Sequence, residues 1–206
     1  MNVSRRNFFQ AVAGLGGLSA LRAQVAGPNT PPLSFTQTPA ARSTVSIVKG
    51  DVRRKIVHDA LEAIDHQIKP VIQRKKYVII KVNNVSTERQ LAATHADALW
   101  GILDYLQPKY KLPVMIVESS AGDTMTGFRN FGYAKLAADK DARQVSLIDL
   151  NEEAKYQVIP LIDYDLHLQP VRLAARLMDP DAYVINAAML KTHNTVVATL
   201  SVKNMV

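Results

Sequence analysis

Four apolar runs in the sequence each end in polar side chains that could bind a ligand or move a proton. After the four runs come Asn83-Asn84, Glu118 to Asp123, Asp149-Leu150-Asn151, and Asn186 with Lys191 to Asn194. Amides, hydroxyls and carboxylates hold ligands through hydrogen bonds, lysine adds a fixed positive charge, and histidine titrates near neutral pH. The pattern therefore favours one shared binding site built from several strand ends; ordinary polar loops whose residues cap the following helices are the alternative.

The basic residues near the end of the sequence indicate the chemistry of this site. We predict Lys191, His193 and Lys203 as catalytic residues, with the lysines neutralising an anion and the histidine moving a proton. The predicted ligand-binding residues are Asn83, Asn84, Glu118, Ser119, Ser120, Gly122, Asp123 and Asn194. Glu118 or Asp123 would balance the charge or hold a metal, and the sequence does not name one.

The turn from Ser119 to Gly122 has two interpretations. It resembles a loop that directs backbone N–H groups toward a phosphate or carboxylate. It lacks the glycine spacing of the known nucleotide-binding motifs, so a plain tight turn explains it equally well. The two interpretations differ in where the N–H groups point.

The metal and redox chemistry open to the chain is limited by its composition. The sequence has no cysteine, which excludes disulfides, thiolate metal sites and cysteine-ligated iron–sulfur clusters within these residues. Asp163, Asp165 and His167 are close in sequence and form either a metal cluster or a solvated loop. The cofactor stays unassigned.

Hydrophobic periodicity predicts the elements that position these residues. Apolar runs at 77–82, 114–117, 145–148 and 182–185 indicate strands, and 44–48 indicates a further short strand. Helical spacing predicts helices over 51–69, capped by Asp51 and ended by Pro70, from Thr94 to before Pro108, and near 171–177. We expect an α/β fold: a mostly parallel, layered sheet with helices on both faces.

The first residues of the chain predict where the protein is located in the cell. Ser4-Arg5-Arg6-Asn7-Phe8-Phe9 precedes an uncharged apolar run from Ala11 to Leu21, which is too short to span a bilayer. This arrangement resembles a bacterial twin-arginine signal; an amphipathic helix with two solvated arginines is the alternative. The resemblance implies recognition by the twin-arginine export machinery, export in the folded state to the periplasm or cell exterior, and no stable transmembrane span in the mature chain.

The domain organisation follows from this leader. We predict a signal peptide at 1–23, a flexible proline-rich tether at 24–42 and an α/β domain at 43–206. The net charge of +7 includes three arginines of the leader, Arg5, Arg6 and Arg22. No stripe of basic residues with interleaved aromatics remains, so we do not expect nucleic-acid binding.

Several of the same residues carry a family resemblance. Lys81 to Asn84, Glu118 to Thr124, Leu190 to Asn194 and Thr199 to Met205 resemble motifs of the domain of unknown function 362 family, in order over essentially the whole mature chain. Members often carry a twin-arginine leader or a ferredoxin-like cluster domain. This chain has the leader and lacks the cluster cysteines. Family members usually continue beyond the last motif, which implies a truncated fragment or a second half on a partner chain.

A more distant likeness concerns the histidine and the lysine. The order of a strand-end motif, then His193, then Lys203 is similar to the nickel-pincer lactate racemase family. There, histidine and lysine act on a 2-hydroxy acid and a nucleotide-derived cofactor. The glycine-rich context of that motif is replaced here by Ala198-Thr199-Leu200-Ser201.

Two function classes follow from the sequence. The first is an exported enzyme, or part of one, that acts on a small anionic substrate or cofactor at the strand ends. The second is a non-catalytic periplasmic module that binds a ligand or metal, or assists assembly, with the same residues. Turnover of the bound ligand distinguishes the enzyme from the module.

Overall fold

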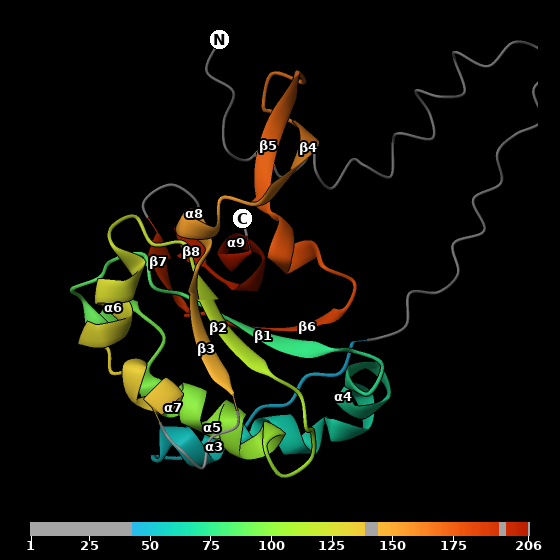
Figure 1. Cartoon of the computed structure of the whole chain (residues 1–206), viewed down its shortest axis with the longest axis vertical. Helices are drawn as coiled ribbons and strands as arrows, with labels where there is room; N and C mark the ends of the chain where they lie inside the picture. Colours follow the sequence, from blue (N-terminus) through green and yellow to red (C-terminus); the bar gives the residue numbers. More distant parts are fainter. Residues whose placement is uncertain (1–42, 139–143, 194–196, 206) are drawn as a thin grey trace, which may run out of the picture. The chain divides into compact units, whose positions relative to one another are not determined.

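A four-stranded parallel sheet organises the chain. The computed structural model describes residues 43–138, 144–193 and 197–205. The strands are β1 (Tyr77–Val82), β2 (Val114–Glu118), β3 (Val145–Asp149) and β6 (Ala182–Ala187), in the order β3-β2-β1-β6. All three pairings are parallel, as the apolar runs predict (Figure 1). The α/β fold class is therefore confirmed.

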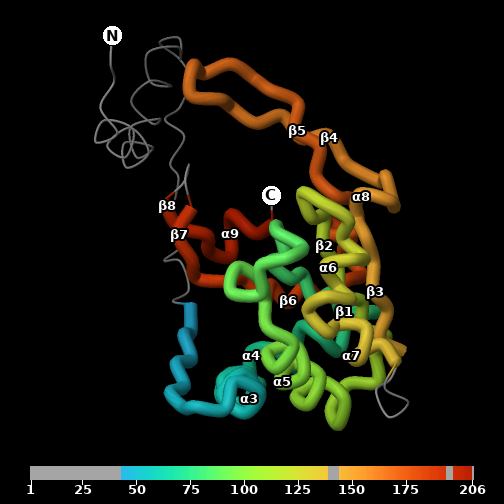
Figure 2. The backbone as a smooth tube through the Cα atoms, turned by 90° about the vertical axis from the view of Figure 1, so that its left-hand side faces the viewer, coloured from blue at the N-terminus to red at the C-terminus, as the bar shows by residue number. Residues whose placement is uncertain are grey.

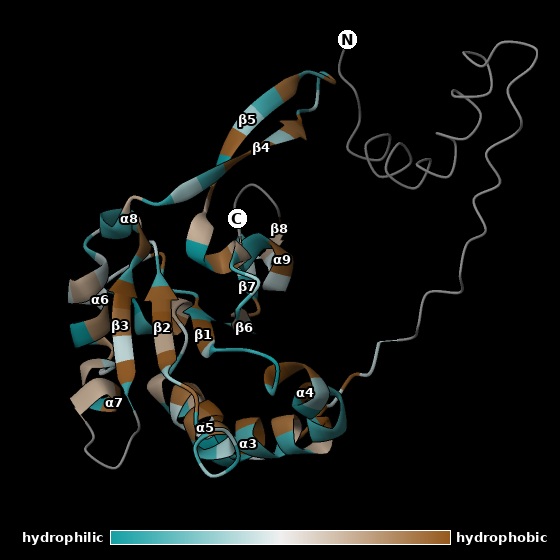
Figure 3. Ribbon diagram, turned by 45° about the vertical axis from the view of Figure 1, so that its right-hand side comes forward, coloured by the Kyte–Doolittle hydropathy of each residue, from teal (hydrophilic) through white to brown (hydrophobic). Residues whose placement is uncertain are grey.

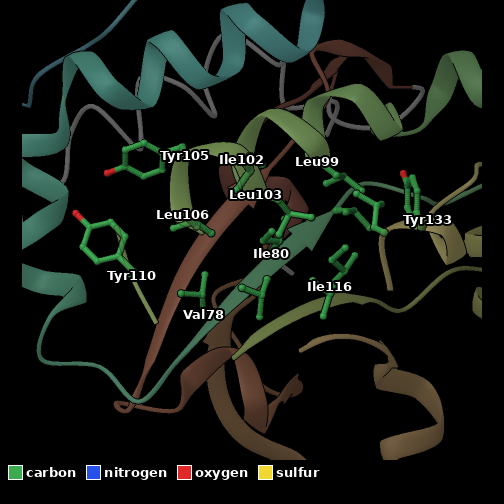
Figure 4. Packing of buried hydrophobic residues seen from close by; sticks show 14 of the residues in the cluster. Val78, Ile80, Leu99, Ile102, Leu103, Tyr105, Leu106, Tyr110, Ile116 and Tyr133 are labelled. Atoms are coloured by element: carbon green, nitrogen blue, oxygen red, sulfur yellow. The ribbon is translucent and has the colours of Figure 1, made fainter. Parts of the chain in front are cut away.

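One face of the sheet carries most of the core. Helices α4 (Asp65–Ile72) and α5 (Ala96–Leu106) supply buried apolar side chains to the cluster that contains Val78, Ile80 and Ile116, and α3 (Arg53–Ala63) packs on α5. Figure 4 shows the α5 side chains Leu99, Leu103 and Leu106 directed at these strand residues. At the β3 edge lie α6 (Thr124–Asn130) and α7 (Ala134–Ala138) (Figure 2).

The opposite face has a thinner cover. Ile79, Val117, Leu150 and Ala182 form a second small cluster there. Its cover comes from α8 (Leu150–Glu153), from the short 3-10 helix η3 (Ala175–Met178) and from Ala174. Helices thus lie on both faces, but the second layer is built from single turns. This thin cover leaves room for a pocket beside β1 and β2.

The predicted helix over 51–69 is in fact two helices. It breaks at Ile64, and Pro70 lies inside α4 instead of ending the first helix. The break allows Ile68 and Ile72 to be buried on either side of the exposed Pro70. The carbonyl that loses its partner to the proline can therefore face water. Asp51 does not cap α3, because the N-cap is Val52 without a side-chain hydrogen bond.

Two further element predictions are wrong. No strand forms at 44–48, where Val45 and Ile47 are exposed. In place of the helix near 171–177 the chain forms β5 (Leu168–Ala174), followed by η3. β5 pairs antiparallel with β4 (Tyr156–Ile162), an element that the sequence reading missed. We call this two-stranded hairpin the arm; it projects away from the four-stranded sheet (Figures 1 and 3).

Prolines protect both free edges of the arm. The backbone bonds Asp163 N–His167 O and Ala175 N–Lys155 O mark hydrogen-bonded pairs at its two ends. Because such pairs alternate along an antiparallel ladder, the facing Pro160 and Pro170 occupy a non-hydrogen-bonded pair. Each free edge therefore lacks an N–H group at its centre, which blocks pairing with a further strand.

The remaining described elements are short. They are the 3-10 helix η2 (Gln90–Ala92), the hairpin of β7 (Lys191–His193) and β8 (Val197–Thr199), and α9 (Ser201–Asn204). Among the described helices, none has both the length and the apolar character needed to cross a bilayer. The leader and tether predicted at 1–42, and Asn194, lie outside the described residues.

Asp65 links α4 to the C-terminal end of α5 and gives a test of this packing. Its carboxylate accepts hydrogen bonds from Tyr105 at 2.8 Å and from Tyr110 and Lys109 at 3.1 Å. Burial alone raises the pKa of Asp65, but these three donors outweigh it, so the pKa lies below its usual value. A lowered carboxyl pKa stabilises the fold above the ordinary value of about 4, and this contribution is lost as pH falls toward the folded-state value.

We therefore expect Asp65→Asn to flatten the acid limb of the stability profile. The amide keeps an acceptor for the tyrosines but cannot titrate. Denaturant unfolding of both proteins at a series of pH values between about 6 and 3 would measure the slope. Equal slopes for Asp65→Asn and the wild type would show that Asp65 does not couple folding to protonation.

Candidate functional site

The carboxyl ends of the parallel strands meet at one edge of the sheet and carry a pocket. Ligands in open α/β sheets bind at this edge, close to the point where the strand order reverses. In this sheet the order reverses at β1, whose neighbours are β2 and β6. The pocket has a volume of about 290 Å³ and is lined by Lys81, Asn83, Val85, Glu118, Ser119, Ala121, Leu150, Arg172, Leu173, Ala174, Leu177, Lys203, Asn204 and Met205.

Glu118 organises the two strand-end loops beside the pocket. Its carboxylate accepts hydrogen bonds from Lys81 Nζ at 2.8 Å, from the Ser119 N–H at 2.9 Å and from the Asn84 N–H at 2.9 Å. Both side chains of the Lys81–Glu118 ion pair are about 5% exposed. A buried carboxylate with three donors, one of them a cation, is fully compensated. Glu118 thus positions the loops after β1 and β2.

Asn204 closes the crevice between β1 and β6. Its Nδ2 donates to Asn186 Oδ1 at 2.7 Å and to the Val82 carbonyl at 3.2 Å. Its Oδ1 accepts from Asn83 Nδ2 at 2.7 Å. The buried Asn204 therefore fixes α9 against the ends of both strands, and this places the neighbouring Lys203 on the pocket wall.

The lining of the pocket carries a net positive charge. Lys81, Arg172 and Lys203 contribute three cations, and Glu118 contributes one anion that Lys81 already neutralises. Within the described part of the chain, Lys203 makes no hydrogen bond or ion pair through its side chain. The Arg172 guanidinium lies 4.5 Å from the centre of the Tyr156 ring. Two cations thus remain without an acidic partner in the pocket wall.

Lys191 lies near these charges but outside the pocket wall. Its Nζ donates to the Ala92 carbonyl at 2.6 Å. Burial and the nearby Lys203 cation lower the pKa of Lys191, and Glu118 opposes part of this effect. Neither Lys191 nor His193, both on β7, is among the described residues that line the pocket. The predicted catalytic trio is therefore divided, with Lys203 alone beside Asn83 and Ser119.

Three backbone N–H groups of the turn from Ser119 to Gly122 already have hydrogen-bond partners within the protein. The N–H groups of Ser119, Ser120 and Ala121 donate to Glu118, to Thr124 Oγ1 and to the Val85 carbonyl. The Ser120 hydroxyl donates to the Asn84 carbonyl at 2.5 Å. These bonds join the turn to the loop after β1, so of the two interpretations the structural turn applies.

Two other predicted ligand-binding residues differ in how their side chains are satisfied. Asn84 is fully buried beside Gly127 of α6, and neither Oδ1 nor Nδ2 of its side chain has a hydrogen-bond partner among the described residues. Asp123 caps α6 by accepting a hydrogen bond from the Thr126 N–H at 2.5 Å, and this bond lowers the pKa of Asp123. Neither lines the pocket.

A comparison with known protein families identifies the family of the chain. Residues 78–206 match the family described as a domain of unknown function (DUF362), which covers more than half of the chain. The chain belongs to this family. The searches of curated proteins and of solved structures give no match. The DUF362 match concerns neither the leader nor a racemase, so both stay predictions.

The DUF362 fold also explains the acidic bend at 163–167. Asp163 accepts hydrogen bonds from the N–H groups of Asp165 and His167, both at 2.9 Å, and so forms the turn of the arm. Among the described residues, no group of three or more His, Cys, Asp or Glu side chains is placed to hold a metal. Of the two interpretations of this bend, the loop applies.

Three polar residues of the pocket wall were not among the site residues predicted from the sequence. Lys81 and Asn204 lie within its family motifs, and a lysine inside an otherwise apolar strand is a signal of a buried ion pair. Arg172 carries no such signal, because it reaches the pocket only through the arm. All three lie on the pocket wall.

Proposed function

We propose that this DUF362 chain binds a small anion in the pocket at the carboxyl edge of its sheet. The observation that supports the proposal is the excess of cations in the wall, with Lys203 free of an acidic partner among the described residues. Lys81 does not contribute freely, since it is paired with Glu118. A half-buried lysine without a partner gains most from an anion that replaces its lost hydration.

Replacement of Lys203 tests the proposal. We expect Lys203→Gln to weaken the binding of inorganic phosphate by roughly 10- to 150-fold, because a charge-assisted contact contributes about 1.5–3 kcal/mol. Isothermal titration calorimetry would measure the change. Lys135→Gln, at an exposed position of α7, is the matched control and should bind as the wild type does. Equal affinities for Lys203→Gln and Lys135→Gln would contradict the proposal.

An enzyme of the same site is the second candidate, and the environment of Lys191 favours it. A lysine whose pKa is lowered by burial and by a second cation can act as a base or nucleophile. In this candidate Lys203 holds the anion, and Lys191 and His193, which lie outside the pocket wall, move the proton of a ligand that extends beyond the pocket toward β7. An anion that returns chemically unchanged after prolonged incubation would identify a binding module, and a converted product would identify the enzyme.

We further propose that the protein is exported in its folded state. The proposal rests on Arg5-Arg6 and the short apolar run that follows. We expect the double variant Arg5→Lys, Arg6→Lys to stay in the cytoplasm of the bacterium that expresses it, as fractionation and immunoblotting would measure. Exchange of Arg22, outside the paired motif, is the control. Unchanged periplasmic delivery of the double variant would refute the proposed address.

A further inference from the structure

The residues that line the pocket fall into two chemical groups, which we call its polar half and its apolar half. One half is polar and carries the cations described above. The other half consists of the apolar side chains Val85, Leu150, Leu173 and Leu177, with Ala121, Ala174 and Met205 beside them. Leu150 and Leu177 also belong to the small core cluster on the same face of the sheet. An inorganic anion would satisfy the first half and leave the second half in contact with water.

The volume of the pocket also exceeds the need of an inorganic anion. One water molecule takes about 30 Å³ of liquid, so 290 Å³ corresponds to roughly ten waters. An oxyanion of five covalently bonded heavy atoms takes less space than five separate waters and would leave most of the pocket unfilled. Pockets for whole drug-sized molecules start at about 300 Å³, which limits the ligand to a small molecule.

From these features we infer that the ligand is a small organic anion with one carboxylate or phosphate group and a compact apolar body. The charged group contacts Lys203 and Arg172, and the carbon body packs on Leu150, Leu173 and Leu177. The inference rests on the proposed anion binding and specifies the class of anion. It also assigns a ligand-contacting role to the arm, since β5 supplies both Arg172 and Leu173.

Arg172 is suited to this contact because its guanidinium stacks on the ring of Tyr156. The Tyr156 ring below the guanidinium restricts its plane, so less conformational entropy is lost when it binds. The planar fork of arginine matches two oxygens of one carboxylate or phosphate group, whereas a lysine offers a point charge. Tyr156 is accordingly a positioning residue that acts through Arg172.

A ligand series on the full-length chain tests the inference. Calorimetric titrations would compare inorganic phosphate with methyl, propyl, butyl and phenyl phosphate, and acetate with butanoate and hexanoate. Each buried methylene is expected to tighten binding roughly fourfold until the apolar half is filled. This rise with carbon number, in either the phosphate or the carboxylate arm, is the result that supports an organic anion.

Three variants separate the two halves of the pocket. Arg172→Gln should weaken every member of the series, while Arg89→Gln, at an exposed position outside the pocket, should change none. Leu173→Ser should reduce the gain in affinity per added carbon, because Leu150 and Leu177 remain, and should leave the affinity for inorganic phosphate unchanged. Tyr156→Leu should weaken the binding of every member less than Arg172→Gln does.

The outcomes distinguish this inference from the function on which it rests. Equal affinity for all members, with the Lys203→Gln loss retained, would overturn the organic ligand and leave anion binding in place. Failure of every phosphate and carboxylate to bind the wild type would overturn anion binding itself. An unchanged series in Arg172→Gln would remove the arm from the site.

Discussion

Glu118→Leu is expected to lower the free energy of unfolding by about 3–5 kcal/mol, the usual cost of breaking a buried ion pair from one side. The variant leaves the Lys81 ammonium buried without its anion and removes the acceptor of the Asn84 and Ser119 N–H groups. Urea unfolding followed by circular dichroism would measure the loss. The loops after β1 and β2 should also become more mobile in this variant, because Glu118 links them in the wild-type protein.

Two further variants make this result specific. Asp181→Leu breaks an ion pair with Lys76 whose side chains are 75% and 45% exposed, so it should cost less than about 1 kcal/mol. The double variant Lys81→Met, Glu118→Leu should recover part of the loss, since no buried charge then remains. A Glu118→Leu protein as stable as Asp181→Leu would mean that the pair is solvated and does not organise the site.

Ile79→Asp should prevent folding. Ile79 has no exposed surface and lies on the central strand β1, between Met115 of β2 and Val184 of β6. An unpaired carboxylate at this position costs several kcal/mol, which is a large share of the stability of a domain of this size. Expression in the insoluble fraction, or soluble protein without a cooperative melting transition, is the expected result.

Ser146→Asp is the matched control for this substitution. Ser146 lies on the edge strand β3 of the same sheet, pairs with Met115 and is exposed. Its exchange should change stability by no more than about 0.5 kcal/mol. A folded Ile79→Asp protein with the melting behaviour of Ser146→Asp would contradict the sheet order described above.

The sheet could be predicted from the sequence because each strand is a local apolar run. Tyr77–Val82 and Val114–Glu118 are buried over nearly their whole length, as expected for parallel strands covered on both sides. The helix break at Ile64 could not be predicted in this way. The break depends on which side chains can be buried against the sheet and α5, and this is a tertiary property. From the sequence alone, Pro70 suggested the end of the helix.

The arm escaped prediction for a related reason. Residues 171–177 have an apolar spacing that fits a helical turn, but β5 is extended because β4 pairs with it through the turn at Asp163. This pairing places Arg172 on the pocket wall. Strand pairing is a long-range contact, and no local pattern around Arg172 encodes its partner.

The position of the candidate site could be predicted from the sequence, but only some of its residues could. Polar residues after parallel strands must gather at one edge, which brings Asn83 and Ser119 to the same pocket. Lys203 reaches this pocket from α9, which Asn204 holds against the strand ends. Which polar groups are already satisfied depends on the register. Lys81 faces Val117 across β1 and β2, and this register lets it reach Glu118. The sequence shows only that Glu118 is a carboxylate near a strand end, so it was predicted to bind a ligand and not to pair with Lys81.

The position of a bound anion is the most direct test of this account. Selenate is a tetrahedral oxyanion whose selenium scatters anomalously, so an anomalous difference map of protein crystals soaked in selenate would locate it. The account predicts an anomalous peak inside the pocket at the carboxyl edge, with an oxygen in hydrogen-bonding distance of Lys203 Nζ, and no such peak in crystals of Lys203→Gln. Peaks confined to other surfaces of the wild-type protein, with the pocket empty at saturating selenate, would contradict it.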